Sequence, residues 1–186
     1  LAKKIVYDID DLIFLGHSSV VNKVSRFLKG KTKAVFLMKK ADHVITCTPF
    51  LDNFVKQYNQ NTTDISSTIN ADLFVPSNEY NNNKTVTIGW TGSHSTLKHL
   101  ELLIPVLKEL AVKIRFKLVV IGNFEISIPG VDVEMIQWTI VKEVENMQKM
   151  DIGIYPLPEE DWVFGKSGLK ALQYMGLGIP AVCSRI

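Results

Sequence analysis

Short apolar runs recur along the chain, separated by longer segments in which apolar residues return every three or four positions. Short runs of apolar and β-branched residues are typical of strands that are covered on both faces. We expect strands at residues 4–9, 43–48, 64–69, 85–91, 116–122, 131–136, 151–157 and 179–184, of which "DISSTI" (64–69) is the weakest.

The segments between these runs have helical spacing. Thr48 and Pro49 are suited to cap and begin a helix, Pro105 is expected to bend another, and Gly178 is suited to end the last one. Strands that alternate with helices predict an α/β fold with parallel sheets covered on both faces. The helices are expected at residues 20–28, 34–41, 49–58, 95–110, 140–150 and 167–178.

The polar stretch "VPSNEYNNNK" (75–84) is the best candidate for a linker. It divides the chain into a first lobe over residues 1–72 and a second lobe over residues 85–186, joined by residues 73–84. Ligands of parallel α/β sheets bind at the carboxyl ends of the strands. Candidate chemistry is therefore expected where the strands end.

The composition is that of a soluble globular protein, with 46% hydrophobic and 22% charged residues among 186. No apolar run approaches the ~18 residues that a membrane span needs. The two cysteines, Cys47 and Cys183, lie in strand-like runs. We expect both to be buried and unpaired, which fits a reducing, cytoplasmic setting.

The net charge is only +2, but seven lysines and arginines and no acidic residue occur between Leu12 and Ala41. The plainer interpretation is a solvated helical face. The alternative is that residues 23–40 dock on anionic lipid head groups, since each basic side chain near such a surface contributes about 1 kcal/mol. Nucleic acid is a less suitable partner, because the aromatic residues are not interleaved with the charges as stacking on bases requires.

The stretch "GWTGSHSTLK" (89–98) places a glycine-containing turn between a strand and a helix. Gly92 permits close approach of a phosphate, Ser93 offers a hydroxyl, and Lys98 brings a positive charge into the first helical turn. A capped turn with no ligand explains the same residues, so this stretch alone is a weak signal.

A second strand end, "IQWT" (136–139), carries Gln137 and Trp138. An indole ring that follows a strand is suited to stack on a flat base. The alternative is a tryptophan buried in the core.

The most informative stretch is "EEDWVFGKSGLKALQYMGLGIPAV" (159–182), where two glycines and two lysines surround the start of a predicted helix. A helix N-terminus presents unpaired N–H groups and about half a positive charge, which together favour a diphosphate. A purely structural loop is the alternative. The candidate ligand-binding residues here are Gly165, Lys166, Ser167, Gly168, Lys170 and Gln173.

Three acidic residues, Asp8, Asp10 and Asp11, end the first apolar run. Carboxylates in this position are suited to a divalent metal that faces a phosphate, as in metal-dependent transferases and phosphatases. The phosphatase pattern needs a threonine or valine shortly after the second aspartate, and Asp11-Leu12 stands there instead. Capping of a helix is the alternative interpretation of these side chains.

The stretch "GKSGLKALQYMGLGIPAV" (165–182) resembles the nucleotide-sugar signature of group 1, family 4 retaining glycosyltransferases, which have the GT-B fold of two Rossmann-like lobes. That signature reads E-G-F-G-x-x-x-x-E-A-M-A-x-G-x-P-V-V. Three earlier segments resemble the family in the same order: "KADHVITCTPFLDNFV" (40–55), "DISSTINADLFVP" (64–76) and "GWTGSHSTLKHLELL" (89–103). The resemblance covers most of the chain from Lys40 onward.

The sequence departs from this family at three positions. The two glutamates of the signature fall on Gly165 and Gln173, and an arginine falls on Ser93. In the family these residues contact the transferred sugar, the ribose and the diphosphate, respectively. Gln173 can still form hydrogen bonds, and Lys166 is expected to replace part of the site. The pattern W-x-x-G-K-x-x-x-K-x-L-Q-Y-M over residues 162–175 resembles a variant branch.

The resemblance implies transfer of a hexose from a nucleotide diphosphate sugar to a saccharide or lipid-linked acceptor, with retention and without a metal or other cofactor. Lys98 and Lys166 would be catalytic, by stabilising charge on the departing diphosphate. Asp8, Asp10 and Asp11 would line the acceptor side of the cleft or cap a helix rather than hold a metal. We expect a cytoplasmic protein of cell-envelope polysaccharide biosynthesis, peripheral at the inner face of the membrane. The family's lobes have further strands and helices, so we expect a piece of a longer protein with both lobes incomplete.

Two other functions stay open. One is a nucleotide-sugar-binding module without catalysis, because the signature's first glutamate is missing. The other is a metal-dependent transferase or phosphatase that uses Asp8 and Asp10.

Overall fold

The computed structural model describes residues 3–12, 31–77 and 85–185. The chain divides into two compact units, and the division does not follow the order of the sequence. The first unit contains residues 3–12, 31–67 and 159–168, and the second contains residues 68–77, 85–158 and 169–185. Each unit has its own parallel sheet and its own hydrophobic core.

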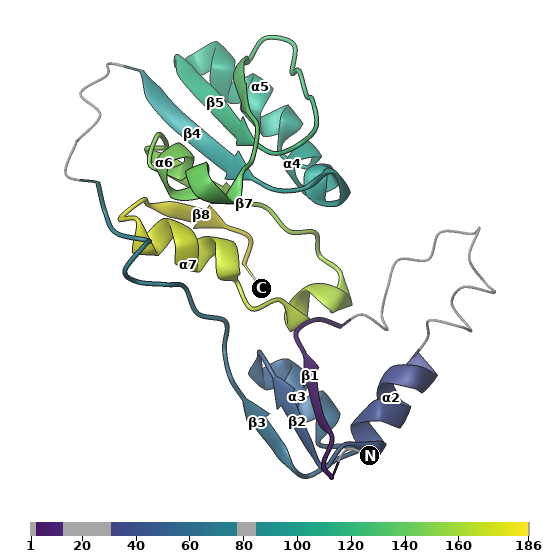
Figure 1. The fold of residues 1–186 in the computed structure, drawn as a ribbon. Coiled ribbons are helices and arrows are strands. Elements are labelled where there is room, and N and C mark those ends of the chain that lie inside the picture. Colours follow the sequence, from purple (N-terminus) through teal and green to yellow (C-terminus); the bar gives the residue numbers. More distant parts are fainter. Residues whose placement is uncertain (1–2, 13–30, 78–84, 186) are drawn as a thin grey trace. The chain divides into compact units, whose positions relative to one another are not determined.

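The first unit is built on a three-stranded parallel sheet (Figure 1). Its strands lie in the order β1 (Val6–Ile9), β2 (His43–Thr46) and β3 (Thr62–Asp64). The helices that the structure describes in this unit are α2 (Lys31–Lys40), α3 (Pro49–Val55) and the 3-10 helix η5 (Asp161–Gly165). Helix η5 comes from far along the chain, yet it packs with elements of the first 67 residues.

Apolar side chains from the two α-helices cover this sheet. Met38 of α2 and Leu51 of α3 are fully buried in one cluster with Ile9 and Val44 of the strands. Helix α3 begins where the sequence predicted, since the Thr48 hydroxyl accepts a hydrogen bond from the Leu51 N–H at 3.2 Å. This contact satisfies one of the donors that a helix start leaves unpaired.

The second unit is built on a five-stranded parallel sheet of order β6-β5-β4-β7-β8. The strands are β4 (Val86–Thr91), β5 (Phe116–Ile121), β6 (Asp132–Ile136), β7 (Ile152–Tyr155) and β8 (Ala181–Cys183). The chain adds β5 and β6 on one side of β4 and then adds β7 and β8 on the other side (Figure 1). This order is Rossmann-like, and ligands of such sheets bind at the carboxyl ends beside the point of reversal.

The helices of the second unit include a break that the sequence predicted only as a bend. The helix expected over 95–110 ends at Glu101, and the next begins at Ile104 with Pro105 in its first turn. Proline lacks an N–H and fits only the first turn, so the interruption falls just before it. These helices are η3 (His94–Thr96), α4 (Leu97–Glu101), α5 (Ile104–Lys113), η4 (Ile140–Lys142), α6 (Glu143–Met147) and α7 (Leu169–Gly176).

Helix α7 ends at a glycine, as the sequence predicted. Gly178 has a φ of +71°, which favours a residue without a side chain. Its N–H donates to the Met175 carbonyl at 3.0 Å, while the Ile179 N–H donates to the Tyr174 carbonyl at 2.9 Å. This Schellman motif satisfies the last carbonyls of the helix and turns the chain toward β8.

Two local expectations are wrong. The strand expected over 64–69 is displaced, because β3 ends at Asp64 and no strand follows within residues 65–69. Cys183 is exposed, since β8 is the edge strand of its sheet, whereas Cys47 is buried as expected. Both cysteines are free thiols.

Some expectations concern residues outside the described ranges. The helix expected at 20–28 lies there, and so do residues 78–84 of the linker. The segment 159–168, expected in the second lobe, belongs to the first unit by its packing. Among the helices that the structure describes, none combines the length and apolar character needed to cross a membrane.

Candidate functional site

The carboxyl edge of the second sheet is formed by closely spaced backbone. The N–H of Gly92, directly after β4, donates to the Ile121 carbonyl at 3.0 Å. A Cβ on Gly122, directly after β5, would lie 2.8 Å from the Gly92 carbonyl oxygen, and a Cβ on Gly92 would overlap the Trp90 ring. Both positions therefore require glycine, and the N–H groups of Gly92 and Gly122 are hydrogen-bonded to the carbonyls of Ile121 and Ile136.

The turn after Gly92 is capped by its own hydroxyl groups. The Ser93 N–H donates to the Thr96 hydroxyl at 2.9 Å, and that hydroxyl donates to the Ser93 carbonyl at 3.0 Å. The Ser93 and Ser95 hydroxyls are also hydrogen-bonded at 2.9 Å. Lys98 is exposed in the first turn of α4. The turn is thus capped by its own side chains, a feature that both interpretations of this stretch share.

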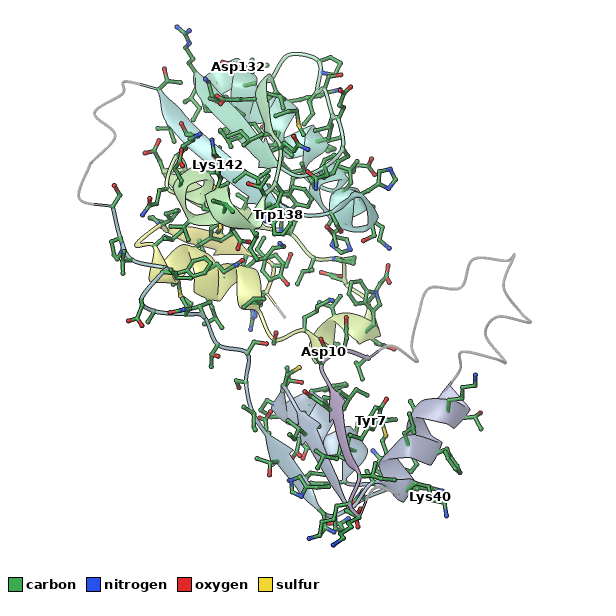
Figure 2. All side chains as sticks on the ribbon, viewed as in Figure 1. Tyr7, Asp10, Lys40, Asp132, Trp138 and Lys142 are labelled. Carbon is green, nitrogen blue, oxygen red and sulfur yellow. The ribbon has the colours of Figure 1, made fainter. Side chains whose placement is uncertain are left out.

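Three side chains from three elements meet at the same edge of the second sheet. Trp138, which follows β6, donates its Nε1–H to Glu143 Oε1 at 3.2 Å. Gln173 on α7 donates its Nε2–H to the same oxygen at 3.4 Å. Figure 2 shows Trp138 and Asp132 at opposite ends of β6 and its flanking loop. Trp138 is 38% exposed and Gln173 only 9%, so the tryptophan is not a core residue.

In the first unit, Lys166 is paired with Asp11, which lies two residues after β1. Its Nζ lies 2.6 Å from Asp11 Oδ2, and about 30% of each side chain is exposed. The same Nζ lies 5.3 Å from the centre of the Trp162 ring, and the Trp162 indole N–H donates to Glu160. The lysine is therefore held between a carboxylate and an aromatic face.

The segment 159–168 is fixed to the carboxyl edge of the first sheet by further contacts. Phe164 stacks on Phe50 at 5.4 Å between ring centres, and the Ser67 hydroxyl donates to the Ser167 hydroxyl at 2.7 Å. Figure 2 shows Asp10 beside η5, at the end of β1 opposite to Lys40. The short helix therefore lies over the strand ends.

A buried thiol joins this edge to the acidic run. Cys47, which follows β2, donates its Sγ–H to the Asp10 carbonyl at 3.0 Å. Burial raises the pKa of the Cys47 thiol, and the nearby carboxylates of Asp10, Asp11 and Asp64 raise it further. The thiol therefore stays protonated and acts as a hydrogen-bond donor rather than as a nucleophile.

The residues selected from the sequence fall in two groups. Asp8, Asp10, Asp11, Gly165, Lys166, Ser167 and Gly168 lie in the first unit, and Gly92, Ser93, Lys98, Gln137, Trp138, Lys170 and Gln173 lie in the second. Gly168 has a φ of +70°, and α7 begins only at Leu169. Lys166 and Ser167 therefore precede the helix, whereas Lys170 lies in its first turn.

Sequence reasoning did not select Glu143, which holds Trp138 and Gln173 together. The available signal was an acidic residue at the start of the helix that follows a strand end. Such a residue is common as a helix-stabilising charge, so its position alone did not single it out.

Among the acidic residues of the first apolar run, the carboxylate of Asp11 is engaged with the protein, whereas Asp8 and Asp10 are exposed. Asp11 accepts the Leu12 N–H through Oδ1 at 2.9 Å and Lys166 through Oδ2. Within residues 3–12, 31–77 and 85–185, no three His, Cys, Asp or Glu side chains gather in a way that would hold a metal ion.

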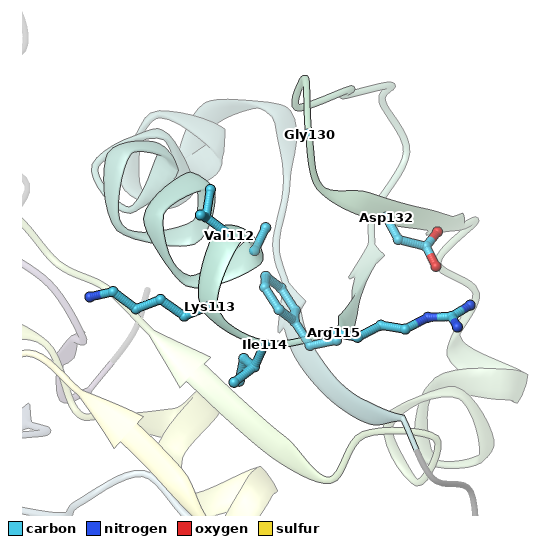
Figure 3. Close-up of a pocket in the computed structure, with 8 residues that line it drawn as sticks. Val112, Lys113, Ile114, Arg115, Gly130 and Asp132 are labelled. Carbon is cyan, nitrogen blue, oxygen red and sulfur yellow. The ribbon is translucent and has the colours of Figure 1, made fainter.

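A hollow of about 300 Å³ lies at the amino edge of the second sheet (Figure 3). It is lined by the end of α5 and the starts of β5 and β6, including Arg115, Gly130 and Asp132. Parallel α/β sheets bind ligands at the opposite edge, so this hollow is separate from the candidate site.

Comparison with solved structures finds glycosyltransferases with a similar fold. Sucrose-phosphate synthase from Thermosynechococcus elongatus superposes with a TM-score of 0.68 at 14% identity, and WaaG, a glycosyltransferase involved in lipopolysaccharide biosynthesis, with 0.67 at 16%. TarM superposes with 0.64 at 15%. The fold is GT-B-like.

These GT-B structures are matched over 96–97% of this chain, which includes both units. The chain spans 50% of the length of the synthase, 55% of WaaG and 36% of TarM. No family model and no curated protein matches the sequence. At these identities the GT-B likeness concerns the fold alone.

Proposed function

We propose that this chain is part of a retaining, metal-independent glycosyltransferase that moves a hexose from a nucleotide diphosphate sugar to a saccharide or lipid-linked acceptor. The observation that carries the proposal is the carboxyl edge of the second sheet. There, the exposed indole of Trp138 is suited to stack on a base, and the turn at Gly92 has no side chain to oppose the approach of a phosphate.

The diphosphate is proposed to be bound by lysine side chains and backbone N–H groups. Lys98 and Lys166 are the proposed catalytic residues, because they stabilise charge that builds on the departing diphosphate. An ammonium has three N–H donors, so Lys166 can bind Asp11 and still contact a phosphate oxygen. The backbone N–H of Ser167 completes the proposed set. The N–H of Gly92 is hydrogen-bonded to Ile121, so Gly92 is proposed only to permit close approach of the phosphate. Front-face substitution with retention requires no further nucleophile.

The remaining selected residues are given supporting roles. Gln137 and Trp138 are proposed to contact the base, and Gln173 the ribose. The other proposed donor-site residues are Ser93, Gly165, Gly168 and Lys170, and the acceptor-side residues are Asp8, Asp10 and Asp11. A neighbouring structure, a point mutant of TarM with a TM-score of 0.60, was solved with fondaparinux, α-GlcNAc-glycerol and UDP, which supports these kinds of ligand.

A role at an anionic membrane surface is proposed for residues 23–40, of which the structure describes α2. Phe36 and Leu37 of this helix are 58% and 43% exposed, and Lys33, Lys39 and Lys40 are exposed beside them. Apolar and basic side chains on one helix favour binding to anionic lipid. Salt-sensitive co-sedimentation with anionic liposomes is expected, and its absence would remove this part of the proposal.

A panel of nucleotide sugars in a thermal-shift assay tests the donor assignment, because a ligand that binds only the folded state raises Tm. Transfer and donor hydrolysis by the complete protein then separate an enzyme from a binding module. We expect activity to survive EDTA. A rise in Tm without turnover would favour the module, and EDTA sensitivity would favour the metal-dependent alternative.

A further inference from the structure

We infer that the carboxylate of Glu143 binds the ribose hydroxyls of the donor nucleotide, an assignment that rests on the proposed function and extends it to the nucleoside. Glu143 is the first residue of α6 and belongs to none of the motifs selected from the sequence. Its place between Trp138 and Gln173 is what singles it out.

Two donors fix the orientation of this carboxylate. The indole Nε1–H of Trp138 and the amide Nε2–H of Gln173 both point to Oε1, at 3.2 and 3.4 Å. The shorter bond lies within the usual range for N–H···O, and the longer one is weak. Because both donors bind Oε1, the orientation of the whole carboxylate is fixed, and Oε2 points away from the two donors.

The second oxygen of Glu143 is suited to a ligand hydroxyl. Within the described residues, the structure gives Oε2 no hydrogen-bond partner, and the side chain is half-buried. A carboxylate oxygen accepts more than one hydrogen bond, and partial burial removes some of its water. An adjacent pair of hydroxyls would replace that lost hydration.

The neighbouring indole indicates a nucleoside rather than a free sugar. Trp138 is 38% exposed, and its N–H edge is occupied by Glu143. A ring held by its edge can stack on a base with its face. The sugar attached to that base then lies beside the indole edge, where Glu143 stands. Carboxylates at the carboxyl edge of Rossmann-like sheets bind ribose hydroxyls in this way.

A purely orienting role for Glu143 predicts a different result. If the carboxylate only holds Trp138 and Gln173 in place, its removal weakens the binding of all nucleotides equally. If it binds the ribose, its removal weakens ribonucleotides and leaves 2′-deoxyribonucleotides nearly unchanged.

Calorimetric titrations with UDP, GDP and ADP and their 2′-deoxy forms separate the two roles. We expect wild type to prefer the ribo form by roughly tenfold to hundredfold, the value of one hydrogen bond to a charged group. Glu143→Ala should abolish this preference, and Glu143→Gln should reduce it. Glu145→Gln, an exposed carboxylate on the same helix, is the matched control and should keep it.

Each ratio compares two ligands on one variant, so a partly unfolded variant does not change it. Equal weakening of both forms by Glu143→Ala, or no ribose preference in wild type, would overturn the inference and leave the proposed function standing. If wild type binds none of these nucleotides, the proposed function fails and the inference falls with it.

Discussion

Gly165 is expected to tolerate no side chain, because Leu12 occupies the space beside it. A Cβ at this position would lie 2.6 Å from Leu12 Cγ and 3.2 Å from the Leu12 backbone nitrogen. Leu12 is 2% exposed, and its Cγ is one bond from its own Cβ, so it cannot move aside without leaving the core. Overpacking of this kind destabilises the folded state by about 1–3 kcal/mol. The replacement of glycine also restricts the unfolded chain, which stabilises the protein by about 0.4–1 kcal/mol. We expect Gly165→Ala to lower the free energy of unfolding by roughly 1–2 kcal/mol.

Urea unfolding followed by circular dichroism tests this in a double-mutant cycle. Leu12→Ala alone should cost about 2–5 kcal/mol, but it also makes room for a Cβ at Gly165. The double variant should therefore lose less free energy of unfolding than the two single variants lose together. The difference should be about 1 kcal/mol or more.

The control for this cycle is Gly168→Ala. Gly168 has a φ of +70° and no atom within 4 Å of a Cβ, so its cost of about 1–2 kcal/mol arises from the backbone and should add to that of Leu12→Ala. The described packing is wrong if Gly165→Ala is as stable as wild type. It is also wrong if the loss of stability from Gly165→Ala simply adds to the loss from Leu12→Ala.

Three further outcomes are expected. In the complete protein, Lys166→Met should lower kcat by about 10²–10³-fold and Lys166→Arg by less, measured by steady-state kinetics; equal rates would exclude a catalytic charge. Burial alone would raise the pKa of Asp52, but its hydrogen-bonded ion pair with Lys56 at 2.6 Å lowers the net pKa. The folded state therefore favours the charged form of Asp52, and this stabilisation is present above about pH 4 and is lost as pH falls through the lowered pKa. In a plot of Tm against pH, Asp52→Asn should therefore reduce the slope on the acid side. An unchanged slope would contradict this expectation. Gly178→Ala should lower the free energy of unfolding by about 1–2 kcal/mol, and Gly178→Asn should lower it by less, because asparagine adopts positive φ more readily. Urea unfolding measures both losses, and equal losses would argue against the Schellman motif.

The alternation of strands and helices was predictable because its signals are local. The apolar runs that became β4 and β5 are covered on both faces, so every residue in them is apolar, small or β-branched apart from a few at the ends. Thr48 and Gly178 fulfil their predicted roles because a cap depends on neighbours within a few positions.

The features that sequence reasoning missed depend on distant contacts. The packing of residues 159–168 in the first unit follows from Phe50 and Asp11, more than 100 positions away in the chain. Glu143 gains its importance only because β6 and α7 bring Trp138 and Gln173 to it. Cys183 appeared buried because its run is apolar, and only the strand order makes β8 an edge.

The return of residues 159–168 to the first unit affects how the protein can be dissected. A fragment that begins at residue 68 would keep every strand of the five-stranded sheet, yet it would carry a segment stripped of its packing surface. Phe164 would lose its stacking partner, and Lys166 would lose its carboxylate. Such a fragment would still be able to report on Trp138 and Glu143, whereas measurements on Lys166 require a chain that includes β1.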